Sequence, residues 1–583
     1  MADKDMGLSL EITSLNDYFL TSGSIHIDSD ERKQMTDKLL VYVPVLSDAA
    51  TLGKEGSFAF ASYYGDHMVL QRGPQRANIW GYSPHLGEKV TVTVGGHSVS
   101  TTVVSGHVAK GGVWQVKLQA MTNPGPYVIT ASSNSGRIQL HDVLFGDVWI
   151  CSGQSNMQVS VSQVFNAAHE IEDSNNYPNI RVMTIRNQAS THAETDLLSI
   201  WKHWSPANKG SIGGPNWNYF SAVCWFYGKY LYRHRGYPIG LIASDWGAAR
   251  IEPWMSPQAL STCHVNVPSP LLLPHHEPGK FYVPNVPTVM WNSMMGPLTK
   301  MTIYGAVWYQ GESNDHDPSG YKCLFPAMIA DWRKQFHQAS GGETNAMFPF
   351  GFVQLAALSK THNIGDFPDL RWAQTVNLGY APNSVLKKVF MAVAMDLPDY
   401  NSPWGAIHPR YKQDVGLRLG LAAEAVAYGV ENVHYQGPFP TSVTAHKNSG
   451  TLTIEFDHGR TPIEVRSNDG YEVCCSTNVH AHCSTKDSNW KAAPISAHST
   501  SSINLNYHQH CGGNAHVLGV RYAWRESPCD VKKCAVYSKA NGLPAPPYLS
   551  LGSFALTSYY GDHMVLQSGP QWVNISRVLA APG

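Results

Sequence analysis

The chain has 583 residues, too many for one hydrophobic core, so we expect two or three domains. Hydrophobic residues make up 43% of it, charged residues only 15%, and the formal net charge is -1. This balance fits a globular protein and excludes the basic surface that nucleic acid or an anionic membrane would need. The sequence also lacks an apolar run of about 20 residues, the length of a membrane span.

The first domain is predicted to follow an extension of little structure over residues 1–56. Charged side chains interrupt residues 1–20, so no secretory signal peptide is recognisable there. Either the natural start of the protein is missing from this sequence, which the cysteines favour, or this form is cytosolic. From Ser57 onward, short strand-like runs alternate with Gly and Pro turns, which predicts a β-sandwich-like domain over 57–145. The runs are Met68–Gln71, Val90–Val94, Trp114–Leu118 and Tyr127–Ala131.

Residues 146–435 alternate apolar strands with amphipathic helices. The predicted strands are Val148–Cys151, Ile239–Ala243, Ile303–Trp308, Gly351–Leu355 and Val389–Met395; the helical patterns cover Val223–Leu231 and Val415–Ala423. Strand and helix in alternation predict an α/β domain, a parallel sheet flanked by helices. In such sheets the chemistry lies beyond the carboxyl ends of the strands.

Strands return over 436–548, for example Leu452–Phe456 and Val517–Trp524. Six of the ten cysteines lie in this region: Cys474, Cys475, Cys483, Cys511, Cys529 and Cys534. Their density predicts a disulfide-stapled β module made in an oxidising compartment, without indicating which cysteines pair. Residues 549–583 form a tail in which Ser558–Gln567 repeats Ser62–Gln71 without change. We interpret the copy as a duplicated segment without a sheet of its own, rather than as a swapping strand.

Two clusters in this module bear on metal binding, His480-Ala481-His482-Cys483 and His508-Gln509-His510-Cys511. Imidazole and thiolate together would suit zinc or copper. The interpretation we favour is disulfide cysteines beside exposed histidines, and we expect neither a metal nor another cofactor.

The motif Gly153-Gln154-Ser155-Asn156-Met157 directly follows a predicted strand. A serine at a strand-to-helix turn can present its hydroxyl above the sheet edge, and its backbone N–H can help to bind an oxyanion. Because Met157 occupies the second glycine position of G-x-S-x-G, the motif does not indicate an α/β-hydrolase. Alone, the same residues would fit an ordinary helix-capping turn.

Three further motifs complete a plausible esterase set. Trp246-Gly247 follows the second strand, where a glycine lets its N–H approach a reacting carbonyl. Gln310-Gly311-Glu312-Ser313-Asn314 follows the third, and its amide can donate to a tetrahedral oxyanion. Ile407-His408-Pro409 precedes a helix and supplies an imidazole, the usual base for a serine nucleophile.

Taken in this order, the four motifs resemble the Ser, Gly, Asn and His blocks of the SGNH/GDSL hydrolases. The similarity is closer to the sialate O-acetylesterase family, through HDVLFGDVWICSGQSNMQ, YPIGLIASDWG, GAVWYQGESN and the segment from FMAVAMDL to AIHPRYKQ. The resemblance spans about 58–547. It implies an SGNH-type catalytic domain over 146–435, with Ser155 as nucleophile and His408 as base. Gly247 and Asn314 would complete the oxyanion hole.

The sequence departs from this family pattern at three places. Such enzymes usually carry an aspartate three residues before the histidine, where this chain has Gly405. Asp396, Asp399 or a backbone carbonyl could orient the imidazole instead. The family's Gly-Gly-Thr reads Gly247-Ala248-Ala249, and its His before Pro-Leu is Gly296.

The resemblance implies a serine esterase acting on O-acetylated sialic acids or sialoglycans, in a lysosomal or secreted setting. Two alternatives remain open: an acetylesterase for other acetylated carbohydrates, and a catalytically weakened sugar-binding relative. The oligomeric state is not predicted.

Overall fold

The computed structural model describes residues 55–552 except 107, 109, 218, 264–282, 361–365, 447, 458–461 and 479. The expected N-terminal extension up to residue 54 and the duplicated segment Ser558–Gln567 lie outside the described residues.

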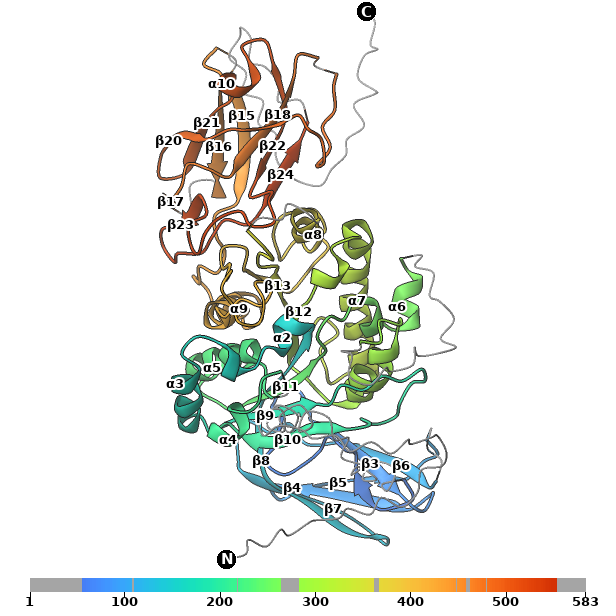
Figure 1. The fold of residues 1–583 in the computed structure, drawn as a ribbon. Coiled ribbons are helices and arrows are strands. Elements are labelled where there is room, and N and C mark those ends of the chain that lie inside the picture. The colour runs from blue at the N-terminus through green and yellow to red at the C-terminus, as the bar shows by residue number, and fades with distance from the viewer. Residues whose placement is uncertain are drawn as a thin grey trace, which may run out of the picture. The chain divides into compact units, whose positions relative to one another are not determined.

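The N-terminal β domain contains all four strands that the sequence predicts. β1 (Ala59–Phe60), β3 (Asn78–Ser83) and β6 (Gly112–Lys117) form one antiparallel sheet. β2 (Val69–Gln71), β4 (Lys89–Val94), β5 (His97–Thr102) and β7 (Tyr127–Ser133) form a second sheet around the start of β8 (Gly136–Gly153) (Figure 1). In β4 the valines are buried and the residues between them are more exposed, the alternation of a sheet with one face on the core.

Strand β8 is 18 residues long and belongs to both of the first two domains. Its first part pairs with β7 and β2, and its last part pairs with the central sheet. The domain boundary expected at residue 145 therefore falls inside one continuous strand, which fixes the β domain to the strand that carries the serine motif.

The predicted α/β class is confirmed by the central sheet, whose order is β10-β9-β11-β8-β12-β13-β14. Besides β8, its strands are β9 (Ile180–Ile185), β10 (Ile200–Pro206), β11 (Ile239–Asp245), β12 (Gly305–Tyr309), β13 (Phe350–Gln354) and β14 (Val389–Val393). All neighbours are parallel except β10 at the edge. Every residue of β11 to β14 is buried, as expected when helices cover both faces.

The helices lie on the two faces of this sheet (Figure 1). α5 (Ala222–Arg235) and α9 (Lys412–Val426) cover the face on which Tyr227 of α5 contacts the rings of Trp149 and Phe390. α7 (Pro318–Ala339) covers the other, where Phe325 contacts Phe350 and Phe352. The shorter helices are α2 (Ser155–Gln158), α3 (Ala167–Asp173), α4 (Lys209–Ile212), α6 (Pro257–Ser261) and α8 (Phe367–Ala373).

The C-terminal module has two four-stranded antiparallel sheets and a two-stranded one. The first contains β15 (Pro440–His446), β16 (Thr451–Phe456), β21 (Ser502–Asn506) and β20 (Ile495–His498). The second contains β19 (Trp490–Ala492), β18 (Tyr471–Ser476), β22 (His516–Tyr522) and β24 (Tyr548–Leu551), and β17 (Ile463–Val465) pairs with β23 (Val536–Ser538). Helix α10 (His508–Cys511) follows β21.

All ten cysteines are paired. The expected stapling of the module consists of Cys474–Cys483, Cys475–Cys511 and Cys529–Cys534. The four scattered cysteines, whose state the sequence left open, form Cys151–Cys224 and Cys263–Cys323. Cys151–Cys224 joins β8 to α5 immediately before the serine motif, and both cysteines are fully buried.

We expect the double variant Cys151→Ala/Cys224→Ala to lower the free energy of unfolding by about 4 kcal/mol. The disulfide closes a separation of 73 residues, so losing it frees a long loop in the unfolded chain. Cys529→Ala/Cys534→Ala is the matched control: its separation is 5 residues, and the cost should be about 2 kcal/mol. Urea unfolding measures both. Equal losses in the two variants would contradict the prediction.

Candidate active site

Three of the four motifs follow neighbouring strands of the central sheet that end opposite one another. Gly153 at the end of β8 pairs with Asp245 of β11 on one side and with Tyr309 of β12 on the other. The segments that follow these strands therefore begin side by side at the carboxyl edge of the sheet.

Gly153 is required by the backbone at this point. Its φ is +143°, and a Cβ there would lie 2.1 Å from the carbonyl oxygen of Tyr309. With no side chain in the way, the chain turns sharply, and the N–H of Gln154 donates to that same carbonyl at 3.0 Å. Ser155 is then the first residue of the short helix α2, with its side chain partly exposed.

The structure brings Ser155 and His408 together. Nε2 of His408 lies 2.8 Å from Oγ of Ser155, and Nδ1 lies 2.7 Å from the carbonyl oxygen of Trp404. A carbonyl can only accept a hydrogen bond, so Nδ1 carries the proton of the neutral ring and Nε2 is the acceptor. The serine hydroxyl therefore donates to Nε2, the arrangement in which an imidazole can remove its proton.

The group that orients the imidazole is a backbone carbonyl. Asp396 forms an ion pair with Arg418 at 2.6 Å, and Asp399 forms one with Arg410 at 2.6 Å. Neither carboxylate bonds to His408, so of the three alternatives open from the sequence the structure has the backbone carbonyl of Trp404.

The ring of Trp217 packs against the imidazole. The ring centroid of Trp217 lies 4.9 Å from that of His408 in an edge-to-face arrangement, and Trp217 also contacts Trp404. Burial, with a smaller contribution from the positive charge of Lys412, lowers the pKa of His408 to about 4, although the bond to the Trp404 carbonyl acts in the opposite direction. The imidazole is therefore neutral, and able to act as a base, from mildly acidic pH upward.

Both expected oxyanion donors lie at the same edge and have acceptors within the chain. The N–H of Gly247 donates to Oε1 of Gln158 at 2.7 Å. Nδ2 of Asn314 donates to Oε2 of Glu252 at 3.0 Å, while its Oδ1 accepts from Gln310 at 2.7 Å. An amide NH₂ has two hydrogens, so Asn314 keeps one further donor; the single hydrogen of Gly247 is engaged.

The departures from the family pattern have local consequences. Gly405 has a φ of +87°, and its carbonyl accepts the N–H of His408 at 2.9 Å, so a tight turn replaces the carboxylate. Ala248 has a φ of +58°, in the left-handed region that favours glycine. Ala249 is fully buried.

Sequence reasoning missed Gln158, Trp217 and Trp404. Gln158 stands one residue beyond the quoted five-residue motif, where its amide could have suggested a polar contact. Trp404 acts through its backbone, which no side-chain pattern reveals. Trp217 comes from a loop far from the other motifs in sequence, and nothing local indicates its place.

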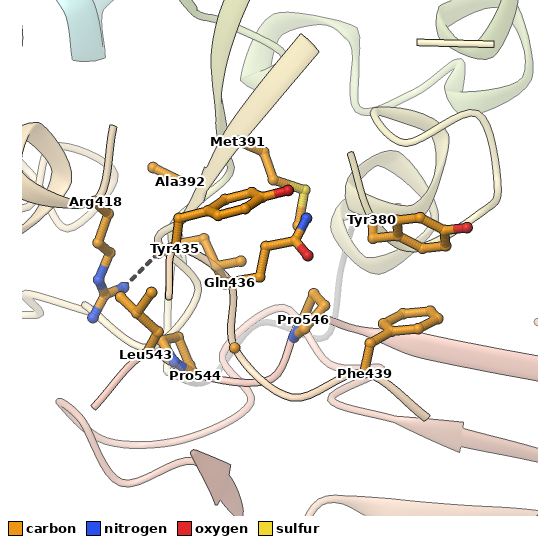
Figure 2. Close-up of a pocket in the computed structure, with 12 residues that line it drawn as sticks. Tyr380, Met391, Ala392, Arg418, Tyr435, Gln436, Phe439, Leu543, Pro544 and Pro546 are labelled. Carbon is orange, nitrogen blue, oxygen red and sulfur yellow. Dashed lines mark hydrogen bonds between the residues drawn. The ribbon is translucent and has the colours of Figure 1, made fainter. Parts of the chain in front are cut away.

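A small, mainly apolar pocket lies away from this dyad, between the edge strand β14 and the C-terminal module (Figure 2). Tyr380 and Phe439 form one wall with ring centroids 5.1 Å apart, and Pro544 and Pro546 come from the module. None of the four predicted site residues lines it.

Metal ligation is not indicated for the histidine clusters. Cys483 and Cys511 are both in disulfides, so neither offers a thiolate, and His480 and His482 are exposed. Over the described ranges no group of three or more His, Cys, Asp or Glu side chains could hold a metal ion. Within the same ranges, no helix is both long and apolar enough to cross a bilayer.

Two family models match the chain. Residues 145–404 match the family model of carbohydrate esterases described as sialic acid-specific acetylesterase, and residues 441–552 match the sialate O-acetylesterase C-terminal domain. Sialate O-acetylesterase of Mus musculus is 40% identical over 88% of this chain and 97% of its own length; that of Homo sapiens is 40% identical over 85% and 92%.

Among solved structures, a carbohydrate acetylesterase from Xanthomonas citri superposes with a TM-score of 0.68 at 26% identity, covering 84% of this chain and 99% of its own. The expected SGNH-type fold is thus confirmed, and the identity to the mammalian proteins extends over nearly their whole length. The chain therefore belongs to the sialate O-acetylesterase family of carboxylic ester hydrolases.

Proposed function

We propose that the chain is a serine esterase that hydrolyses O-acetyl esters of sialic acids, with Ser155 as nucleophile and His408 as base. The observation that carries the proposal is the 2.8 Å contact between Nε2 of His408 and Oγ of Ser155, with Nδ1 of the imidazole held by a carbonyl. The names of the mammalian relatives support the substrate class.

The reaction proceeds by two acyl transfers. Nε2 of His408 takes the hydroxyl proton as Oγ of Ser155 attacks the acetyl carbonyl, and the proton then passes to the departing sugar oxygen. A water molecule, deprotonated by the same imidazole, attacks the acetyl-enzyme and releases acetate. The Trp404 carbonyl keeps Nδ1 protonated throughout, which presents the lone pair of Nε2 to the serine.

The oxyanion of each tetrahedral intermediate is placed against the N–H groups of Ser155 and Gly247 and the amide of Asn314. Gly247 must exchange its bond to Gln158 for one to the oxyanion. Such an exchange agrees with the general finding that catalytic hydrogen bonds align only in the complex with substrate. Each donor of this kind contributes about 10²–10³ in rate.

A lysosomal or secreted location belongs to the same proposal. Five disulfides support it, because structural disulfides form and persist in oxidising compartments. Sequencing the amino terminus of the native protein from fractionated cells tests this: recovery of an intact Met1 in the cytosolic fraction alone would overturn it.

Ser155→Ala is expected to abolish hydrolysis of an activated aryl acetate and to remove covalent labelling by a fluorophosphonate. Loss of a serine nucleophile typically costs about 10⁶ in kcat. Ser261→Ala, at an exposed serine of α6, is the matched control and should keep both signals. Acetate release by Ser155→Ala at the wild-type rate would refute the mechanism, and wild-type labelling without turnover would favour the weakened relative.

The pH dependence of kcat/KM should show an unusually low acid limb. The base works only when neutral, and because its pKa is lowered to about 4, the rate should stay flat down to about pH 5 and halve near pH 4. Stopped assays with an aryl acetate whose own chemistry does not titrate in this range measure the limb. An inflection between pH 6 and 7, the ordinary histidine range, would contradict this account of the site.

Substrate choice separates the proposal from its enzymatic alternative. We expect mono-O-acetylated sialic acid to be deacetylated with a kcat/KM at least about tenfold above that for acetylated xylan, since pocket contacts commonly discriminate by 1–3 kcal/mol. Acetate release is followed for both under the same conditions. A preference for xylan would favour an esterase of other acetylated carbohydrates, and turnover of neither would favour a binder.

A further inference from the structure

A chain of buried polar side chains lies directly beneath the Ser155–His408 pair. Asn156, the residue after the nucleophile, donates through Nδ2 to Oε1 of Glu312 at 2.6 Å and to the carbonyl of Ile407 at 2.8 Å. Its Oδ1 accepts from Nζ of Lys412 at 2.6 Å. The amide thus links the serine turn, the short helix η6 (Glu312–Asn314) and both ends of the histidine segment.

Lys412 is an unusual member of this group. It is the first residue of α9 and is fully buried, and its Nζ lies 5.0 Å from the ring centroid of Tyr309. Among the described residues no carboxylate lies within ion-pair distance of it, and its Nζ donates a hydrogen bond to Asn156. An ammonium group taken out of water is costly, so its contact with the amide is expected to matter to the site.

The position of the Asn156 amide explains how Lys412 can affect His408. Ile407 immediately precedes His408, so the bond from Asn156 to its carbonyl fixes the backbone of the base relative to the residue that follows the nucleophile. The bond from Lys412 prevents the amide from rotating, because reversal would place an NH₂ group against an ammonium. Without Lys412, Oδ1 of the amide loses this donor, and the bonds of Nδ2 to Glu312 and Ile407 must hold the amide without it.

We propose that Lys412 is a positioning residue for the Ser155–His408 pair, acting through the side chain of Asn156. The inference rests on the proposed function. Lys412 touches neither substrate nor the reacting atoms; it holds the amide that holds the histidine loop, and its charge acts on the imidazole.

The surrounding charges define what a variant should change. Glu312 on η6 and Asp399 in the loop before α9 both favour the protonated form of Lys412, whose pKa burial lowers to about 7. Asp399 is paired with Arg410, and Tyr309 of β12 stays neutral because burial raises its pKa. Near pH 4 Lys412 is therefore charged, and that charge opposes protonation of His408.

The test compares Lys412→Met, which keeps the length of the side chain but removes its charge, with Lys229→Met. Lys229 of α5 is also buried, but it pairs with Glu170 and Asp173 of α3, outside the site. Thermal unfolding, fluorophosphonate labelling and the pH profile of kcat and KM for an aryl acetate are measured for both.

Lys412→Met should lower kcat by about 10²-fold with little change in KM, because a displaced base loses rate rather than ground-state binding. Its acid limb should move to higher pH by roughly one unit, because a nearby positive charge no longer opposes protonation of the imidazole. Lys229→Met should lower the unfolding temperature while leaving kcat and the limb unchanged.

Glu312→Gln is a second variant, which keeps the test informative if Lys412→Met fails to fold. This isosteric change keeps the charge of Lys412 near pH 4, so its limb must not move upward. An upward shift in Glu312→Gln, or wild-type kcat and limb in a folded Lys412→Met, would overturn the role of Lys412. Activity retained by Ser155→Ala would instead overturn the proposed function, so the two failures are distinguishable.

Discussion

The site depends on three parallel strands that end at the same level of one sheet. Gly153 stands between Asp245 and Tyr309 in the register of β11, β8 and β12. A Cβ on this residue would lie only 2.1 Å from the carbonyl oxygen of Tyr309, so the chain can turn here only because the side chain is missing. Any larger residue would separate β8 from β12 and move Ser155 away from the edge. Burial of these strands on both faces makes this register rigid, so segments far apart in sequence begin from fixed points.

The imidazole is adapted to a site without a carboxylate partner. A carbonyl fixes the tautomer as an aspartate would, but it contributes no negative charge to stabilise an imidazolium. Burial beneath the ring of Trp217 also favours the neutral imidazole, and so does the positive charge of Lys412. The arrangement therefore keeps the imidazole neutral at acidic pH and at the same time makes it less basic.

Much of the fold could be predicted from the sequence because its signals are local. Buried parallel strands read as continuous apolar runs, as in Ile239–Asp245, and α5 and α9 show helical periodicity. The continuity of β8 could not be predicted, because a strand that changes its neighbours part-way has no composition break to mark it. The edge strand β10 was missed because Ile200–Pro206 mixes polar and apolar residues and is only partly buried.

The sequence predicted those parts of the candidate site whose side chains lie within recognisable motifs. The meeting of Ser155 with His408 followed from motif order and resemblance. The orienting group did not, since the Trp404 carbonyl is backbone and both candidate aspartates are taken by arginines that lie elsewhere in the sequence. Likewise, nothing near Gly247 or Asn314 reveals that their donors meet Gln158 and Glu252.

The segment that carries Ser155 also holds the candidate site together. Three amide side chains, at Gln154, Asn156 and Gln158, alternate from the residue before helix α2 to its last residue, and together they contact all three of the other motifs. Gln154 accepts from the N–H of Gly311 at 3.2 Å, Asn156 donates to the carbonyl before His408 at 2.8 Å, and Gln158 accepts from Gly247 at 2.7 Å.

An amide can donate and accept at once, so each side chain can bond to backbone groups whatever side chains those segments carry. This explains how segments separated by up to 253 residues in the sequence keep a common geometry. The motif around Ser155 therefore has a second role. The amide side chains next to Ser155 position the segments of Gly247, Gly311 and His408 against it. Replacing any one of these amides should therefore first displace the segment that it holds, and should affect Ser155 only through that displacement.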